Sequence, residues 1–145
     1  MVDGESRLRV LRREKPSLMP GRGGRQRPVP GQALTMRVRR EPGHVLVTVA
    51  GEIDIATVAQ LEEQLSALAV AGGTVLADLT QVSFIDAAGL RALGRAAGQA
   101  AAHGGSVHAI CGRDHILRLF QLTGLDHRIS VARTLTEALQ SDQRS

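Results

Sequence analysis

Asp54 and Asp86 are the two carboxylates whose positions could carry chemistry, because each follows an apolar segment typical of a strand. Two carboxylates that meet at one edge of a sheet could act as a general acid and a general base. Each is explained equally well as a cap, since an Asp side chain at a helix start accepts from free N–H groups, for Asp86 those of Ala88 and Gly89. The pair has no candidate nucleophile with it, so we favour capping and expect a protein that is not an enzyme, with no catalytic residue.

Other kinds of reactive site find little support in the residue pattern. The five histidines are scattered, without the close pairing that metal sites need. The sequence contains no Gly-x-Ser-x-Gly elbow and no glycine-rich phosphate loop followed by Lys-Ser or Lys-Thr. Cys111, the single cysteine, lies in an apolar run and is expected to be a buried structural thiol. We therefore predict neither a metal nor a cofactor.

Composition narrows the remaining function classes. The 145 residues include two Phe and no Trp or Tyr, so the core must be aliphatic, and recognition of nucleic acid by base stacking loses its support. The formal charge of +4 belongs to the N-terminal segment, because residues 1–32 hold eight basic and three acidic residues. The remainder is nearly neutral.

Residues 1–32 are predicted to be a disordered basic tail. The stretch 16–31 is rich in Pro, Gly and Arg, with too few apolar residues to offset the entropy of ordering its backbone. Residues 7–15 could form a transient basic turn of helix, and we favour a solvated tail over contact with nucleic acid or an anionic surface. No apolar run is long enough for membrane insertion and none resembles a signal peptide, so a cytoplasmic protein is expected.

The rest of the chain alternates strand and helix patterns. A hairpin is predicted over 34–40 and 45–49, with Gly51 ending its second strand and Asp54 capping a helix that presents Val58, Leu61, Leu65 and Leu68 on one face. Strands are expected at 74–80, 107–111 and 129–131, and helices at 90–102, from Asp114 to Gly124, and from a capping box at Thr134–Glu137 through Leu139. This order predicts an α/β domain with a mixed, largely parallel sheet and helices packed against it.

The stretch from Val82 to Leu93 organises these elements, because it places Asp86 at a corner between a strand and a helix. The following helix presents Leu90, Leu93, Ala97 and Ala101 on one face. Another face carries Arg91, Arg95 and Gln99, which are left for solvent or a partner.

Three short motifs in order resemble the STAS domain of bacterial anti-sigma factor antagonists. They are Gly-Glu-Ile-Asp at 51–54, Asp-x-x-Gly-Leu at 86–90 and Leu-Thr-Gly-Leu-Asp at 122–126. The resemblance covers Leu34 to Leu139 and implies a STAS domain over residues 33–141, with four or five strands backed by helices. It further implies a protein that binds a serine-kinase anti-sigma factor and so releases a sigma factor to RNA polymerase. A homodimer is left open.

The chain departs from the family pattern at the corner. Where the family has Asp-Ser-Ser/Thr-Gly-Leu, with the second hydroxyl phosphorylated by the kinase, this chain has alanines at 87 and 88. Ala88 matches the phosphoacceptor and cannot be phosphorylated. One hypothesis is therefore an antagonist that binds its anti-sigma factor constitutively. Whether Thr80 or Ser83 is phosphorylated instead is left open. The alternative is an adaptor subunit of a lipid-transport ATPase or a signalling scaffold.

Partner contact is predicted on the corner, the helix after it and the neighbouring loop. In this prediction Asp86 holds the helix start, the two alanines give a small close-fitting surface, and the arginines pair with partner acids. The predicted partner-binding residues are Glu52, Ile53, Asp54, Asp86, Ala87, Ala88, Gly89, Leu90, Arg91 and Arg95.

Overall fold

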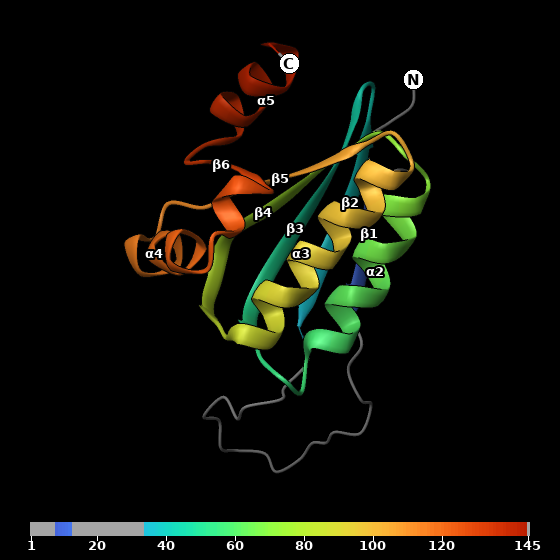
Figure 1. Ribbon diagram of the computed structural model, residues 1–145. Helices are drawn as coiled ribbons and strands as arrows, with labels where there is room; N and C mark the ends of the chain where they lie inside the picture. Colours follow the sequence, from blue (N-terminus) through green and yellow to red (C-terminus); the bar gives the residue numbers. More distant parts are fainter. Residues whose placement is uncertain (1–7, 13–33, 145) are drawn as a thin grey trace.

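The computed structural model describes residues 8–12 and 34–144 (Figure 1). Six strands form one sheet in the order β1-β2-β3-β4-β5-β6, and helical segments connect the successive strands from β3 onward. The strands are β1 (Leu8–Arg12), β2 (Thr35–Glu41), β3 (His44–Ile53), β4 (Thr74–Ile85), β5 (Ser106–Ile110) and β6 (Ser130–Ala132). The helices are α2 (Val58–Val70), α3 (Ala87–Ala102), α4 (Asp114–Thr123), the short 3-10 helix η2 (Leu125–His127) and α5 (Leu135–Arg144).

The predicted fold class is confirmed. β2 and β3 form the expected antiparallel hairpin, and its turn contains Gly43 at a φ of 90°, in the left-handed region that glycine favours. From β3 onward the pairs β3–β4, β4–β5 and β5–β6 are all parallel. The five strands β2 to β6 agree with the predicted four to five, and their connections through helices put helical layers against the sheet.

The two central strands run further than the sequence suggested. Gly51 does not end β3, which continues to Ile53. It adopts a φ of 117°, and the pairing with β4 shifts register between Gly51 and Glu52. Such an irregularity lets a strand continue past a glycine. β4 likewise continues to Ile85, so both strands end beside the corner at Asp86.

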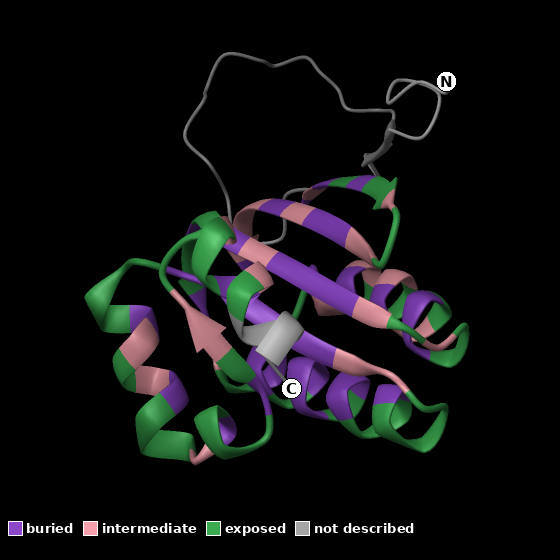
Figure 2. Cartoon of the chain, turned by 90° about the horizontal axis from the view of Figure 1, so that it is seen from above, coloured by how far each residue is buried: buried purple, intermediate pink, exposed green. Residues whose placement is uncertain are grey.

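α2 and α3 lie side by side across one face of the sheet and close the main core (Figure 1). The leucines predicted to face inward on them are all buried: Leu61, Leu65, Leu68, Leu90 and Leu93. Figure 2 shows buried residues along the central strands and on these helices. Ala101, predicted to face inward, is exposed, and Ala100 is buried instead. Because the helix repeats every 3.6 residues, the buried stripe passes through position 100 rather than 101.

A smaller apolar cluster lies on the other face of the sheet, under α5. Leu46, Leu76 and Ile110 pack there against Ala138. Thr134 accepts a hydrogen bond from the Glu137 N–H at 3.1 Å, as its capping-box role predicts, whereas the Glu137 side chain accepts from the Arg133 N–H at 3.0 Å. The helix continues past its predicted end at Leu139 to Arg144.

The structure describes one strand within the predicted tail. Leu8–Arg12 form β1, which pairs antiparallel with β2 from Leu8 opposite Arg39 to Arg12 opposite Thr35. The edge of a hairpin presents unpaired backbone groups that an extended segment can satisfy, which is a tertiary effect that local composition does not reveal. The rest of the predicted tail lies outside the described residues.

Candidate functional site

The candidate site is the end of the sheet where the parallel strands β3 and β4 finish and the helices α2 and α3 begin (Figure 1). Glu52 is the pairing partner of Phe84, and Ile53 is the partner of Ile85. The Asp86 N–H then donates to the Ile53 carbonyl at 3.1 Å. These pairings place the loop after β3 directly beside the corner after β4, so the two predicted parts of the site are neighbours.

Asp86 caps α3 as predicted. Its backbone is extended, with φ −105° and ψ −174°, and its Oδ1 accepts a hydrogen bond from the Gly89 N–H at 3.0 Å. The bond predicted from Gly89 is confirmed, and the cap forms with this N–H rather than with that of Ala88. The Asp86 carbonyl accepts from the Leu90 N–H at 3.0 Å, which begins the helical ladder.

Gly89 is required by packing rather than by its backbone angles. A Cβ atom at this position would lie 2.5 Å from Ile53 Cγ2 and 2.7 Å from Ile85 Cγ1. The missing side chain lets the first turn of α3 rest on the last residues of both strands. Gly89, Ile53 and Leu90 are all buried, so these three predicted site residues shape the corner from inside.

Asp54 organises the neighbouring loop and does not cap α2 as predicted, because Thr57 occupies the N-cap position. Its Oδ1 accepts from the N–H groups of Ala56 at 3.0 Å and Thr57 at 3.1 Å, and α2 begins only at Val58. Thr57, which sequence reasoning missed, donates from its hydroxyl to the Glu52 carbonyl at 2.9 Å and accepts from the Asp54 N–H at 3.0 Å. The Asp-x-x-Thr spacing in the sequence could have predicted this turn, which hydrogen bonds between Asp54 and Thr57 close.

Both carboxylates accept hydrogen bonds from backbone N–H groups, Asp86 as a helix cap and Asp54 within the turn before α2, which supports a structural role over an acid–base pair. Each directs an Oδ1 at N–H groups of its own loop, and Asp54 is only 8% exposed. Among the residues that the structure describes, no group of three or more His, Cys, Asp or Glu could hold a metal ion.

The solvent-facing part of the corner differs in detail from the prediction. Ala87 is exposed, whereas Ala88 is only 9% exposed, so one alanine rather than two presents its methyl group. Arg91, Arg95 and Gln99 are exposed as predicted. Arg95, however, already has a partner within the chain, since its Nε donates to Glu62 Oε2 on α2 at 2.7 Å. Among residues 34–140, whose side chains the structure describes, no ion pair involves Arg91.

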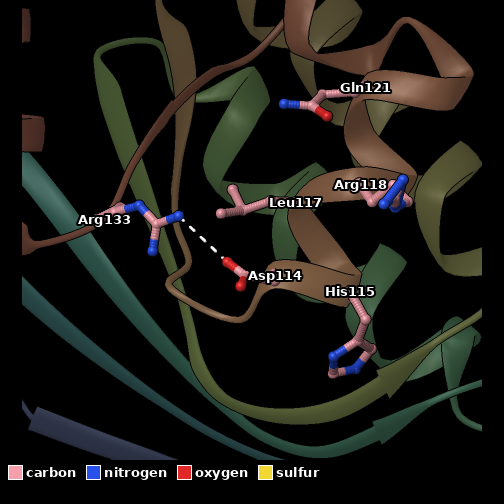
Figure 3. Close-up of a pocket in the computed structure, with 6 residues that line it drawn as sticks. All are labelled: Asp114, His115, Leu117, Arg118, Gln121 and Arg133. Carbon is pink, nitrogen blue, oxygen red and sulfur yellow. Dashed lines mark hydrogen bonds and ion pairs between the residues drawn. The ribbon is translucent and has the colours of Figure 1, made fainter.

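A concave site lies beside α4, and neither Asp54 nor Asp86 lines it. It is an open pocket of about 510 Å³ lined by Asp114, His115, Leu117, Arg118, Gln121 and Arg133. In Figure 3 Arg118 lies across the helix from Arg133.

Asp114 was predicted to cap α4, and this prediction is wrong. Arg113 occupies the N-cap position and no side chain caps the helix. The Asp114 carboxylate instead accepts from Arg133 at 3.3 Å, as the dashed line in Figure 3 shows. One turn of α4 does touch the corner region, because His115 Nε2 lies 3.3 Å from the Ser83 carbonyl oxygen near the end of β4.

Cys111 is buried, as the apolar run around it predicted. Burial raises the pKa of its thiol above the ordinary value of 9.0, so the group stays protonated and a poor nucleophile at neutral pH.

A comparison with known protein families agrees with this architecture. The profile of the STAS domain matches residues 35–138, from the first residue of β2 into α5. The chain belongs to the STAS domain family. Its STAS domain therefore contains both the Asp54 loop and the Asp86 corner, and no helix among the described residues has the length and apolar character to span a membrane.

Several proteins that this STAS domain matches are anti-sigma factor antagonists. An anti-sigma-B factor antagonist of Listeria monocytogenes is 34% identical over 93 residues, which cover 63% of this chain and 82% of the relative. The anti-sigma-B factor antagonist of Bacillus subtilis is 29% identical over 99 residues, or 68% of this chain and 91% of that protein. The crystal structure of an anti-sigma factor antagonist from Mycobacterium paratuberculosis superposes with a TM-score of 0.70 at 28% identity, covering 78% and 96% of the two chains.

Sequence reasoning also missed two exposed apolar side chains of the STAS domain. Ile55, in the turn after Asp54, is 74% exposed, and Phe84, at the end of β4, is 47% exposed. The signal was present in Phe84-Ile85, because two successive large apolar residues in a strand cannot both face the same core. Ile85 is the one that packs inward, against Gly89.

Proposed function

We propose that this STAS domain binds a serine-kinase anti-sigma factor and thereby releases a sigma factor, and that phosphorylation at position 88 does not switch this binding. The relatives that it matches are antagonists of anti-sigma factors, which supports the general role. The serine-kinase type of partner and the release step follow from the family resemblance. Both belong to the proposal.

The observation that carries this proposal is a complete corner with no hydroxyl on its first two helical residues. The cap from Asp86 to Gly89 and the contact of Gly89 with both strand ends need no side-chain oxygen at 87 or 88. The corner can therefore keep its shape with alanines there. A methyl group cannot accept a phosphoryl group, so the surface is permanently in its unmodified form.

The loss of the acceptor has an energetic consequence. A phosphate carries a charge of about −1.5 to −2 at neutral pH. Introducing that charge into an interface built for an uncharged residue weakens binding by several kcal/mol, through desolvation and through repulsion of any nearby acid. Without it, control must come from the abundance of the protein or from competition for its partner.

The test is phosphorylation by the cognate anti-sigma kinase with ATP, followed by mass spectrometry and a binding measurement. We expect no phosphate at residues 87 and 88 and unchanged affinity after incubation. The matched variant Ala88→Ser restores the hydroxyl, should keep binding, and checks that the kinase is active on this surface.

Two outcomes would contradict the proposal. Stoichiometric labelling of Ser83 or Thr80 with loss of binding would replace a permanently active surface by a relocated switch; both residues are exposed, and the Thr80 hydroxyl donates to Asp78 at 2.7 Å. Recovery of an ATPase transporter complex from native lysate, with no anti-sigma factor, would favour the adaptor role instead.

A further inference from the structure

The pocket beside α4 has no part in the proposed function, because none of its lining residues belongs to the predicted partner-binding set. Its volume of about 510 Å³ lies within the range of small-molecule sites, roughly 300–1,000 Å³. Arg133 follows β6, and the other lining residues all belong to α4. Asp114, Leu117 and Gln121 fall on one face of this helix, and in Figure 3 the Arg133 side chain points toward that face.

The Arg133 guanidinium is held in position before any ligand arrives. Its Nη1 donates to the Gly112 carbonyl at 3.2 Å, and its Nη2 donates to Asp114 Oδ1 at 3.3 Å. The Arg133 backbone is fixed as well, since its N–H donates to Glu137 Oε1 at 3.0 Å. Because a guanidinium has five N–H donors, these bonds leave donors for a second acceptor without reorienting the group.

The Asp114 carboxylate indicates which chemical group suits this guanidinium. The planar N–H donors of arginine match the two oxygens of a carboxylate. Asp114 fills that role only weakly, because its side chain is 92% exposed and exposed ion pairs contribute little free energy. A carboxylate brought by a ligand can therefore bind beside Asp114 or replace it at small cost.

The other lining side chains indicate the rest of the ligand. Leu117 is the apolar member of the lining and lies one turn from Asp114, so a hydrocarbon group next to the carboxylate would pack on it. Gln121 adds a neutral amide one turn further along. Arg118 forms no ion pair among residues 34–140. Together with Arg133 it outweighs Asp114, so the lining carries a net positive charge.

We propose that this pocket binds a small carboxylic acid with a short apolar chain. The carboxylate pairs with Arg133, the chain packs on Leu117, and Arg118 adds longer-range attraction. Asp114 is an internal competitor for Arg133. The proposal is independent of the anti-sigma factor, so either can fail without the other.

The probe is sodium hexanoate, with sodium acetate as its counterpart without the longer chain. Each is titrated into the full chain at constant ionic strength, and the backbone amide resonances of α4 are followed by NMR. We expect saturable shifts with a dissociation constant of about 1–5 mM for hexanoate, as befits a small ligand in an open pocket, and about tenfold weaker binding of acetate. Leu117→Ala should weaken hexanoate binding about fivefold and leave acetate within about twofold.

Variants of the charged residues test the role of Arg133. Arg133→Gln should weaken hexanoate binding at least about tenfold, whereas Arg91→Gln, which changes an exposed arginine outside the pocket, should stay within about twofold. Asp114→Asn removes the competing charge but keeps an oxygen that can accept from Arg133, so hexanoate should bind about threefold more tightly. Asp126→Asn, outside the pocket, controls for the change in net charge. Thermal unfolding curves confirm that each variant is folded.

Tighter binding by Asp114→Asn is the decisive result, because a purely structural ion pair between Asp114 and Arg133 would not produce it. Three results would each overturn the proposal. The first is a set of α4 shifts that grow linearly with hexanoate and do not respond to Arg133→Gln. The second is equal affinity for acetate and hexanoate. The third is that Asp114→Asn binds hexanoate no more tightly than Asp126→Asn.

Discussion

The corner at Asp86 and the start of α4 at Asp114 look alike in sequence and differ in structure. In both, an aspartate follows a parallel strand and lies at the start of a helix. Asp86 accepts from the Gly89 N–H and is half-buried, whereas Asp114 caps nothing and its side chain is 92% exposed, beside Arg133. The difference lies in the contacts of the backbone. The first turn of α3 packs on two strand ends through Gly89, while α4 begins after Gly112, near which a Cβ atom would meet nothing within 4 Å.

The largest expected effect follows from this packing. Gly89→Ala places a methyl group within 2.5 to 2.7 Å of Ile53 and Ile85. Overpacking of this kind should lower the free energy of unfolding by about 2–3 kcal/mol. Gly112→Ala, the matched change before α4, should stay within about 0.5 kcal/mol. Urea unfolding of both variants measures the difference, and equal stabilities would show that close packing does not distinguish the two helix starts.

A negative charge placed at the corner should lower the affinity for the anti-sigma factor. Ala88→Asp introduces a carboxylate at a side chain that is only 9% exposed and imitates part of the charge of a phosphate. We expect its affinity for the anti-sigma factor to fall at least about tenfold, as the cost of an unmatched charge at an interface. Ala88→Ser is the control and should bind like the wild type. Calorimetric titration decides, and an unchanged affinity for the Asp variant would place the interface elsewhere on the domain.

The smallest expected effect is the difference in stability lost when each of the two aspartates is replaced by alanine. Asp86→Ala removes a helix cap and should cost about 1 kcal/mol of stability. Asp114→Ala removes an exposed ion pair with Arg133, which should cost less than about 0.5 kcal/mol. The two urea midpoints provide the measurement. A cost for Asp114→Ala as large as that for Asp86→Ala would mean that the residue type at the helix start matters more than its contacts.

Much of the architecture could be predicted because it depends on local patterns. The hairpin, the inward leucines of α2 and α3 and the helix stop at Gly124 follow from alternation, helical periodicity and the conformational freedom of glycine. The cap at Asp86 was predictable for the same reason, since it joins atoms three residues apart. Several features that the sequence did not reveal involve residues whose partners are distant in sequence. Arg95 is engaged by Glu62 and Asp114 by Arg133, and β1 pairs with a strand more than twenty residues away.

The sequence by itself determined the order of strands and helices after residue 34, the presence of a capped corner after β4 and the absence of a hydroxyl at position 88, because each is a property of neighbouring residues. Only the tertiary structure decided what the corner exposes. The approach of α3 to the ends of β3 and β4 buries Ile53, Ile85 and Gly89 and leaves Ile55 and Phe84 in solvent. Which of two adjacent apolar residues faces outward depends on the packing of elements that are far apart along the chain, and no local pattern contains that information.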